Sequence, residues 1–168
     1  ILSISCQAQD ADSLLEKDAN PLLAKDAISQ TKWVDSLYNN MSLQEKIGQL
    51  FVIGLPGEEF DSETSELVEK IKPGGICLFA RNTKDAVKTR ELLDDVADAL
   101  PFQPFFSIDQ EGGLVDRLRR IIEPIPSAKD IGLSGDTENA VKLARYTAEA
   151  IRILGFNMNY APVVDVSN

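Results

Sequence analysis

The chain contains no histidine, and this absence narrows the chemistry available to it. Histidine is the commonest general base and metal ligand, so sites built on Ser-His-Asp or Cys-His pairs are excluded. The only two cysteines, Cys6 and Cys77, are far apart in sequence and form no metal-binding pattern. Cys77 lies in an apolar run and is expected to be a small buried residue. We therefore expect neither a metal nor another cofactor.

Positive charge is also scarce, because 17 Lys and Arg face 27 Asp and Glu, for a formal net charge of −10. So acidic a surface repels phosphate backbones and anionic lipids, which disfavours nucleic acid and membrane surfaces as partners. No stretch approaches the ~20 apolar residues that a membrane-spanning helix needs. A neutral carbohydrate is compatible with this surface, although charge alone does not select one.

The first residues look like the end of a secretion signal. There is no initiator methionine, the opening residues are mostly apolar, and Cys6 and Ala8 supply the small residues of a cleavage site. We expect a mature start near Gln9 and export to the periplasm or the extracellular space. A lipoprotein with its lipid on Cys6 is the alternative. Residues 9–30 are rich in Asp, Ala, Lys and Ser, so residues 1–30 are interpreted as a signal-peptide remnant and linker.

From residue 31 onward, apolar strands alternate with helical segments. Apolar runs typical of buried parallel strands occur at 51–55, 76–79, 105–108 and within 157–166. Helices are expected between them, begun by capping residues at Ser42, Asp61 or Ser62, Thr83, and Asp136 or Thr137. This alternation predicts an α/β fold with a parallel sheet.

The alternation stops after the fourth strand. A closed (β/α)8 barrel needs about 250 residues, whereas this sequence has 168. Four strands without closure would leave two unpaired edges. We therefore expect residues 31–168 to form the N-terminal half of a TIM-type (β/α)8 barrel, with a small open sheet as the alternative.

The segment Asp109-Gln110-Glu111-Gly112-Gly113 directly follows the third strand. Side chains at the carboxyl ends of parallel strands point into the site, so the Asp109 carboxylate is expected at its rim, able to accept hydrogen bonds from hydroxyls. Gly112 and Gly113 would permit a sharp turn and the approach of a ligand. Arg117 can bring a forked donor over the same mouth. An ordinary capped turn with a solvated arginine explains these residues equally well.

Other polar residues follow the neighbouring strands. Asp165 comes after the fourth strand and Arg81-Asn82 after the second, so polar groups from three strands could line one mouth. A loop-starting Asp and a helix cap are the simpler interpretations. Two carboxylates can catalyse glycoside hydrolysis, but the sequence alone does not show whether Asp109 forms such a pair with Asp165 or Glu111. A small α/β hydrolase that binds a metal through these three carboxylates is a further alternative.

Four stretches occur in the order and spacing of one known family, namely 41–50, 74–82, 108–113 with Arg117, and 160–166. They resemble the opening helix, the second strand, the most recognisable N-terminal motif and the fourth strand of glycoside hydrolase family 3. The likeness is to the β-N-acetylhexosaminidase branch of that family. The resemblance implies a (β/α)8-type barrel and a retaining mechanism through a covalent glycosyl-enzyme intermediate on an Asp.

The resemblance also implies roles for single residues. Asp109 and Arg117 match residues that hold hydroxyls of the terminal, non-reducing sugar in that family. Leu114 stands where this branch usually has Arg, and Asp116 replaces a common Gln, which bears on substrate preference more than on family. The other residues expected to bind substrate are Glu111, Gly112, Gly113 and Asp165.

The family's nucleophilic Asp and its acid/base His would lie beyond Asn168, so we expect no catalytic residue within this chain and no turnover by it alone. The complete protein is expected to be an exported bacterial exo-β-glycosidase, a β-N-acetylglucosaminidase acting on cell-wall or chitin-derived sugars. Its substrate would carry a terminal β-linked N-acetylglucosamine or glucose. The alternative is a non-catalytic carbohydrate-binding or scaffold protein built on a decayed barrel.

Overall fold

The computed structural model of the chain describes residues 21–165, with side chains from Thr31 onward. The expected cleavage site lies outside these residues, and so does Cys6, the residue that the lipoprotein alternative would lipidate. The chain divides into two compact units, residues 1–42 and residues 43–168. In the first unit the described structure is helix α2 (Pro21–Asn40), which begins inside the stretch predicted to be a linker. Proline suits the start of this helix because the first turn needs no N–H donor at that position.

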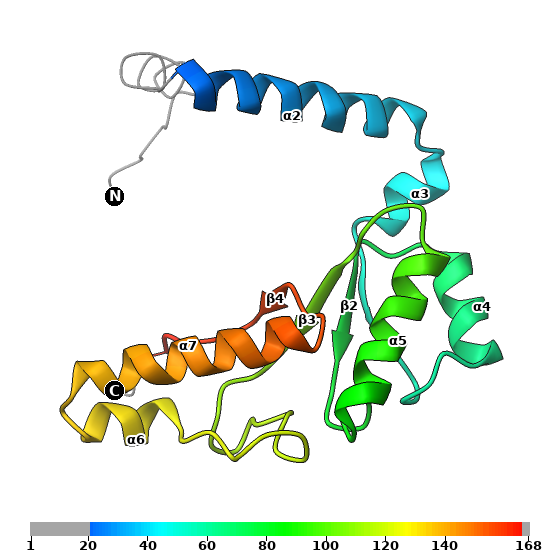
Figure 1. Cartoon of the computed structure of the whole chain (residues 1–168). Helices are drawn as coiled ribbons and strands as arrows, with labels where there is room; N and C mark the ends of the chain where they lie inside the picture. The colour runs from blue at the N-terminus through cyan, green and yellow to red at the C-terminus, as the bar shows by residue number, and fades with distance from the viewer. Residues whose placement is uncertain (1–20, 166–168) are drawn as a thin grey trace, which may run out of the picture. The chain divides into compact units, whose positions relative to one another are not determined.

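The second unit is an α/β unit with one parallel sheet (Figure 1). Its strands run in the order β1-β2-β3-β4, and each neighbouring pair is parallel. The strands and helices lie close to the expected positions, except that α6 was not anticipated. In chain order they are α3 (Leu43–Gly48), β1 (Val52–Gly54), α4 (Ser62–Ile71), β2 (Gly75–Leu78), α5 (Ala86–Ala99), β3 (Phe105–Ile108), α6 (Ala128–Leu133), α7 (Thr137–Ile153) and β4 (Met158–Asn159).

Aspartates begin three of these helices. The Asp61 carboxylate accepts from Thr64 N at the start of α4, and Asp136 does the same from Glu138 N at the start of α7. Each is one of the two residues that the sequence offered as the cap, Asp61 or Ser62 for α4 and Asp136 or Thr137 for α7. The prediction that Thr83 caps α5 is wrong, because Asp85 is the cap and accepts from the amides of the first turn.

The hydrophobic core lies between the sheet and helices α4 and α5 (Figure 1). Along α5, residues 89, 92, 93 and 96 are buried, which is the i, i+3, i+4, i+7 spacing of one helix face. Val87, an apolar residue in the first turn of the same helix, lies off this face and is 64% exposed. Each fully buried side chain contributes about 1.5–3 kcal/mol. The core is completed by Leu55, Val68, Ile76, Leu78, Phe106, Ile108, Leu118, Leu154 and Phe156.

Strand β1 differs from the expectation of a fully buried strand. Phe51 and Val52 are 52% and 50% exposed, whereas Leu55 beyond the strand's end is fully buried. The apolar run does form a strand. Among the described residues, however, β1 stands at one edge of the sheet and pairs with β2 alone. Burial of both faces depends on neighbours that a local pattern does not specify.

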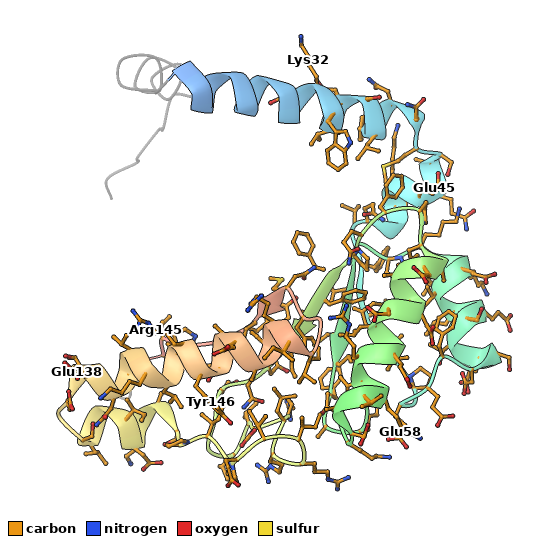
Figure 2. The ribbon with its side chains drawn as sticks, in the orientation of Figure 1. Lys32, Glu45, Glu58, Glu138, Arg145 and Tyr146 are labelled. Atoms are coloured by element: carbon orange, nitrogen blue, oxygen red, sulfur yellow. The ribbon has the colours of Figure 1, made fainter. Side chains whose placement is uncertain are left out.

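Helices α6 and α7 lie side by side after the third strand (Figure 1). Ser127 and Asp130 form a reciprocal capping box that begins α6. Glu138 in the first turn of α7 lies 3.4 Å from Lys142 Nζ (Figure 2). Gly155 follows α7 with φ +99, a positive angle typical of a glycine just past the end of a helix. Within residues 21–165, no helix combines the length and apolarity that crossing a membrane requires.

Candidate functional site

Asp109 and Arg117 meet just beyond the carboxyl end of β3. Arg117 Nη2 lies 3.4 Å from Asp109 Oδ2, and each side chain is 27% exposed. The Arg117 guanidinium also lies over the ring of Phe79, 5.7 Å from its centroid, just past the end of β2. Two neighbouring strand ends thus bring an acid, an arginine and an aromatic ring together, as the sequence predicted for the first two.

One atom of this group is left without a partner. Arg117 Nε is buried and makes no hydrogen bond among the described residues. A buried N–H donor without an acceptor costs about 1–3 kcal/mol. Unpaired buried donors of this kind are rare in native structures, which marks Arg117 as a residue held in place at some cost.

The backbone of Arg117 is held from both sides. Gln110 Oε1 accepts hydrogen bonds from Arg117 N at 2.9 Å and from Leu118 N at 3.0 Å. The Thr83 hydroxyl donates to Arg117 O at 2.7 Å. Gln110 is 2% exposed and Thr83 is fully buried, so water competes little for these hydrogen bonds.

Gln110 is fixed in turn by Asp116, which is 3% exposed. Gln110 Nε2 donates to Asp116 Oδ1 at 2.8 Å, and Ile125 N donates to Asp116 Oδ2 at 3.1 Å. Sequence reasoning missed this pair, since Gln110 was not singled out and Asp116 was noted only as a departure from the family. A buried polar pair across a loop leaves no periodic signal that could have revealed it.

Gly112 and Gly113 adopt φ values of +86 and +60, which favour glycine. A Cβ on Gly112 would overlap the carbonyl oxygen of Pro126, and one on Gly113 would lie 2.7 Å from Ser127 Cβ. Gly113 N also donates to Ile125 O at 2.8 Å. The glycines make the expected sharp turn, and the space beside them is occupied by the chain itself.

The other two carboxylates of the predicted site stand differently. Glu111 is half-buried, and its backbone N donates to Val115 O at 3.0 Å. Asp165 is exposed in the segment that follows β4. Across residues 21–165, no group of three or more His, Cys, Asp or Glu is placed to hold a metal ion. Asp109, Glu111 and Asp165 are therefore not gathered as the metal-binding alternative requires.

Asn82 does not cap a helix, contrary to the simpler interpretation of Arg81-Asn82. Its side chain is fully buried, its Oδ1 accepts from Phe79 N at 2.9 Å, and its Nδ2 donates to Leu55 O at 3.2 Å and to Gly57 O. It therefore ties the loop after β1 to the end of β2, next to Phe79.

Arg81 stacks on Phe79 as well, with its guanidinium 4.8 Å from the ring centroid, and its Nε donates to Leu55 O at 3.0 Å. A cavity of about 360 Å³ opens beside it. Glu58, labelled in Figure 2, lines this cavity and lies 3.5 Å from Lys84 Nζ. The remaining lining residues are Pro56, Gly57, Glu59 and Asp61.

Cys77 lies on β2, paired in register with Ser107. It is half-buried, and burial raises the pKa of its thiol above the ordinary value. Coulombic repulsion from the Asp109 carboxylate adds to this rise, whereas a hydrogen bond with Ser107 opposes it. A raised pKa means little reactive thiolate at neutral pH, in line with the expectation of an unreactive cysteine.

Parallel strands that alternate with helices, with polar groups at the carboxyl ends of the strands, are typical of the α/β class to which (β/α)8 barrels belong. Residues 42–168 match the model of the Glycosyl hydrolase family 3 N terminal domain. The chain belongs to this family, as the sequence motifs had indicated.

Two of the curated proteins that resemble this chain are named as β-hexosaminidases. The chain is 29% identical over 123 residues to a "Beta-hexosaminidase" of Stenotrophomonas maltophilia, covering 70% of this chain and 37% of that protein. It is 32% identical over 129 residues to "Beta-hexosaminidase LpqI" of Mycobacterium tuberculosis, covering 76% and 32%. The chain thus spans about a third of the length of these curated relatives.

Solved structures agree on the fold. A glycoside hydrolase family 3 β-N-acetylglucosaminidase from Paenibacillus superposes with a TM-score of 0.68 at 32% identity, over 73% of this chain and 24% of that one. A family 3 glycosyl hydrolase from Mycobacterium smegmatis gives 0.66 at 27% identity, over 77% and 38%. The predicted fold class, the N-terminal half of a TIM-type barrel, is confirmed.

Proposed function

We propose that this chain forms the sugar-holding part of a retaining exo-β-glycosidase, a β-N-acetylglucosaminidase of bacterial origin. The observation that carries the proposal is the Asp109–Arg117 pair at the carboxyl end of β3. It stands in a family 3 domain whose similar proteins are a β-hexosaminidase and a β-N-acetylglucosaminidase. The substrate class is a terminal β-linked N-acetylglucosamine or glucose.

The pair suits a sugar because it offers opposite hydrogen-bonding characters side by side. The Asp109 carboxylate accepts from hydroxyls, whereas the Arg117 guanidinium donates in a planar fork. Adjacent hydroxyls of a sugar ring both donate and accept, so one can donate to Asp109 while its neighbour accepts from Arg117. The two side chains are each 27% exposed, so a substrate can reach both groups.

The other predicted residues enter the proposal with smaller roles. Glu111 follows β3 and Asp165 follows β4, and we propose them as further acceptors for substrate hydroxyls. Gly112 and Gly113 act through the tight turn that places the loop, since their own space is occupied by residues 126 and 127.

The groups that break the glycosidic bond belong, in this proposal, to parts of the protein other than residues 1–168. A retaining mechanism needs a carboxylate nucleophile and a proton donor about 5–5.5 Å apart. Within residues 21–165 the pair that stands out is a carboxylate with an arginine, and an arginine does not give up a proton at neutral pH. In this proposal the chain binds the sugar, and the rest of the protein cleaves the glycosidic bond.

The test uses the full-length protein with 4-nitrophenyl N-acetyl-β-glucosaminide, and proton NMR of the released sugar. We expect hydrolysis with the β anomer formed first, because two displacements at one carbon retain its configuration. Binding of N-acetylglucosamine without turnover would instead identify a non-catalytic carbohydrate-binding protein. Turnover by residues 1–168 alone, abolished by Asp109→Ala, would overturn the division of labour.

Export is part of the proposal and rests on the opening residues Ile1 to Ala8. Fractionation of producing cells is expected to place the protein outside the cytoplasm. Mass spectrometry of the mature N-terminus separates cleavage near Gln9 from lipidation of Cys6, and a purely cytoplasmic protein would refute export.

A further inference from the structure

We propose that Gln110, Asp116 and Thr83 are positioning residues that hold Arg117 in place to grip the sugar. This inference rests on the proposed function, since it assigns Arg117 to substrate. None of the three is placed to touch substrate itself, because all are at most 3% exposed. They act through hydrogen bonds to the backbone on either side of the arginine.

The two ends of the Arg117 residue are fixed by different parts of the chain. Gln110, in the loop after β3, accepts from Arg117 N at 2.9 Å. Thr83, in the loop after β2, donates to Arg117 O at 2.7 Å. The loop after β3 also carries Asp109, and the loop after β2 begins next to Phe79. These are the two groups that the guanidinium contacts. The hydrogen bonds to the backbone of Arg117 and the contacts of its guanidinium therefore come from the same two loops.

Asp116 determines which way the Gln110 amide points. A carboxylate only accepts hydrogen bonds, so the NH2 group of Gln110 must face Asp116 and its oxygen must face the amides of Arg117 and Leu118. No ion pair among the described residues includes Asp116. Its buried carboxylate is stabilised instead by Gln110 and by the amide of Ile125.

Gln110 and Asp116 take part in four hydrogen bonds. Exchanging the amide and the carboxylate between the two positions tests their role. Gln110→Glu alone sets two carboxylates face to face. Asp116→Asn alone leaves one donor facing another, because the introduced NH2 group must point at either the Gln110 NH2 group or the amide of Ile125. In the double variant, the introduced carboxylate can accept from both loop amides and from the introduced NH2 group. The introduced amide oxygen can still accept from Ile125 N. Every hydrogen bond is then restored with the charge moved to the other residue.

In the full-length protein we expect each single variant to raise KM for the aryl glycoside about tenfold, with a smaller change in kcat. That is the effect of about one misplaced charge-assisted hydrogen bond. The double variant is expected to recover KM to within about threefold. Glu123→Gln, which removes one charge from an exposed residue of the same loop, is the matched control and leaves KM unchanged. Single variants that bind substrate normally, or a double variant with no recovery, would overturn the inference.

A second comparison separates positioning from simple loss of stability. In an Arg117→Ala background, the variants at 110 and 116 should no longer affect KM, because the group they position is gone. A purely structural role would lower activity and the unfolding temperature equally in both backgrounds. If Arg117→Ala itself leaves KM unchanged, the proposed function of Arg117 fails, and this result is distinct from failure of the positioning pair.

Thr83 provides an independent pair of variants if the loop variants do not fold. Thr83→Val keeps the shape but removes the hydroxyl that donates to Arg117 O, and Thr83→Ser keeps the hydroxyl. We expect KM to rise about fivefold in the first and to stay near the wild-type value in the second. Equal KM in both would exclude Thr83 from the positioning group.

Discussion

Arg117 and Asp109 are eight residues apart in sequence, yet Arg117 Nη2 and Asp109 Oδ2 are 3.4 Å apart. The chain turns sharply at Gly112 and Gly113, and the hydrogen bonds that Gln110 Oε1 accepts from Arg117 N and Leu118 N hold the returning segment beside it. The ion pair itself is partly exposed and contributes little to stability. In the proposed function, its role is to place a hydrogen-bond acceptor and a hydrogen-bond donor side by side for a ligand.

Replacing either member of this pair by alanine is expected to lower kcat/KM of the full-length protein. For Asp109→Ala and for Arg117→Ala we expect a loss of about a hundredfold, or about 2.8 kcal/mol, because a sugar hydroxyl loses a charged partner. The double variant should lose less than the product of the two, since the residues share one ligand and each other. Michaelis–Menten kinetics on all three variants measure this, and unchanged kcat/KM in Asp109→Ala would remove it from the site.

Gly112→Ala is expected to destabilise the protein more than an ordinary substitution at positive φ. An alanine at φ +86 costs about 1–2 kcal/mol, and its Cβ would also overlap the carbonyl oxygen of Pro126. Overpacking of this kind adds about 1–3 kcal/mol. Urea unfolding of the purified variants gives the free energies.

Gly135→Ala is the matched control, because Gly135 has φ +67 and open space where its Cβ would go. It carries the cost of positive φ without the overlap. Equal losses for the two variants would show that the loop carrying Pro126 moves aside freely, and that Gly112 is needed only for its backbone angle.

Asn82 allows a test of buried polar pairing at the ends of β1 and β2. Asn82→Asp keeps the acceptor for Phe79 N but replaces the donor to Leu55 O and Gly57 O with another acceptor. We expect a loss of about 3 kcal/mol in unfolding free energy, since a carboxylate then faces two carbonyls in a buried site. Thermal or urea unfolding measures it.

Asn139→Asp is the control for this change in charge. Asn139 lies in the first turn of α7, where the helix dipole favours an acidic side chain. Its substitution is expected to leave the unfolding free energy unchanged or slightly higher. A comparable loss in both variants would mean that added negative charge on an acidic protein, rather than lost pairing at Asn82, causes the effect.

The sequence predicted those features that depend on neighbours along the chain. Strand positions followed from apolar runs, and the starts of α4 and α7 followed from the cap-forming residues at 61 or 62 and at 136 or 137. The position of Asp109 after a strand also needed only local reading. Each of these is decided within a few residues.

What the sequence did not predict depends on distant contacts. Thr83 and Asp85 are both cap-forming residue types, but Asp85 caps α5 and the Thr83 hydroxyl donates to Arg117 O, 34 residues away. The exposure of Val52 depends on the place of β1 in the sheet. The Gln110–Asp116 pair exists because the loop folds back on itself, which no periodicity encodes.

Asp61 makes a pH-dependent contribution to stability. Thr64 N donates to its carboxylate at 2.9 Å, and this hydrogen bond holds the pKa of Asp61 below its ordinary value of 3.8. A pKa that is lower in the folded state stabilises the fold above the unfolded-state value, and this stabilisation is lost as the pH falls through the folded-state value. Asp61→Asn retains an oxygen cap but does not titrate. The unfolding free energies of wild type and variant should therefore differ at neutral pH and converge in acid below 3.8, as urea titrations would show. A difference that stays constant into that range would mean that the charge of Asp61 does not contribute to the cap of α4.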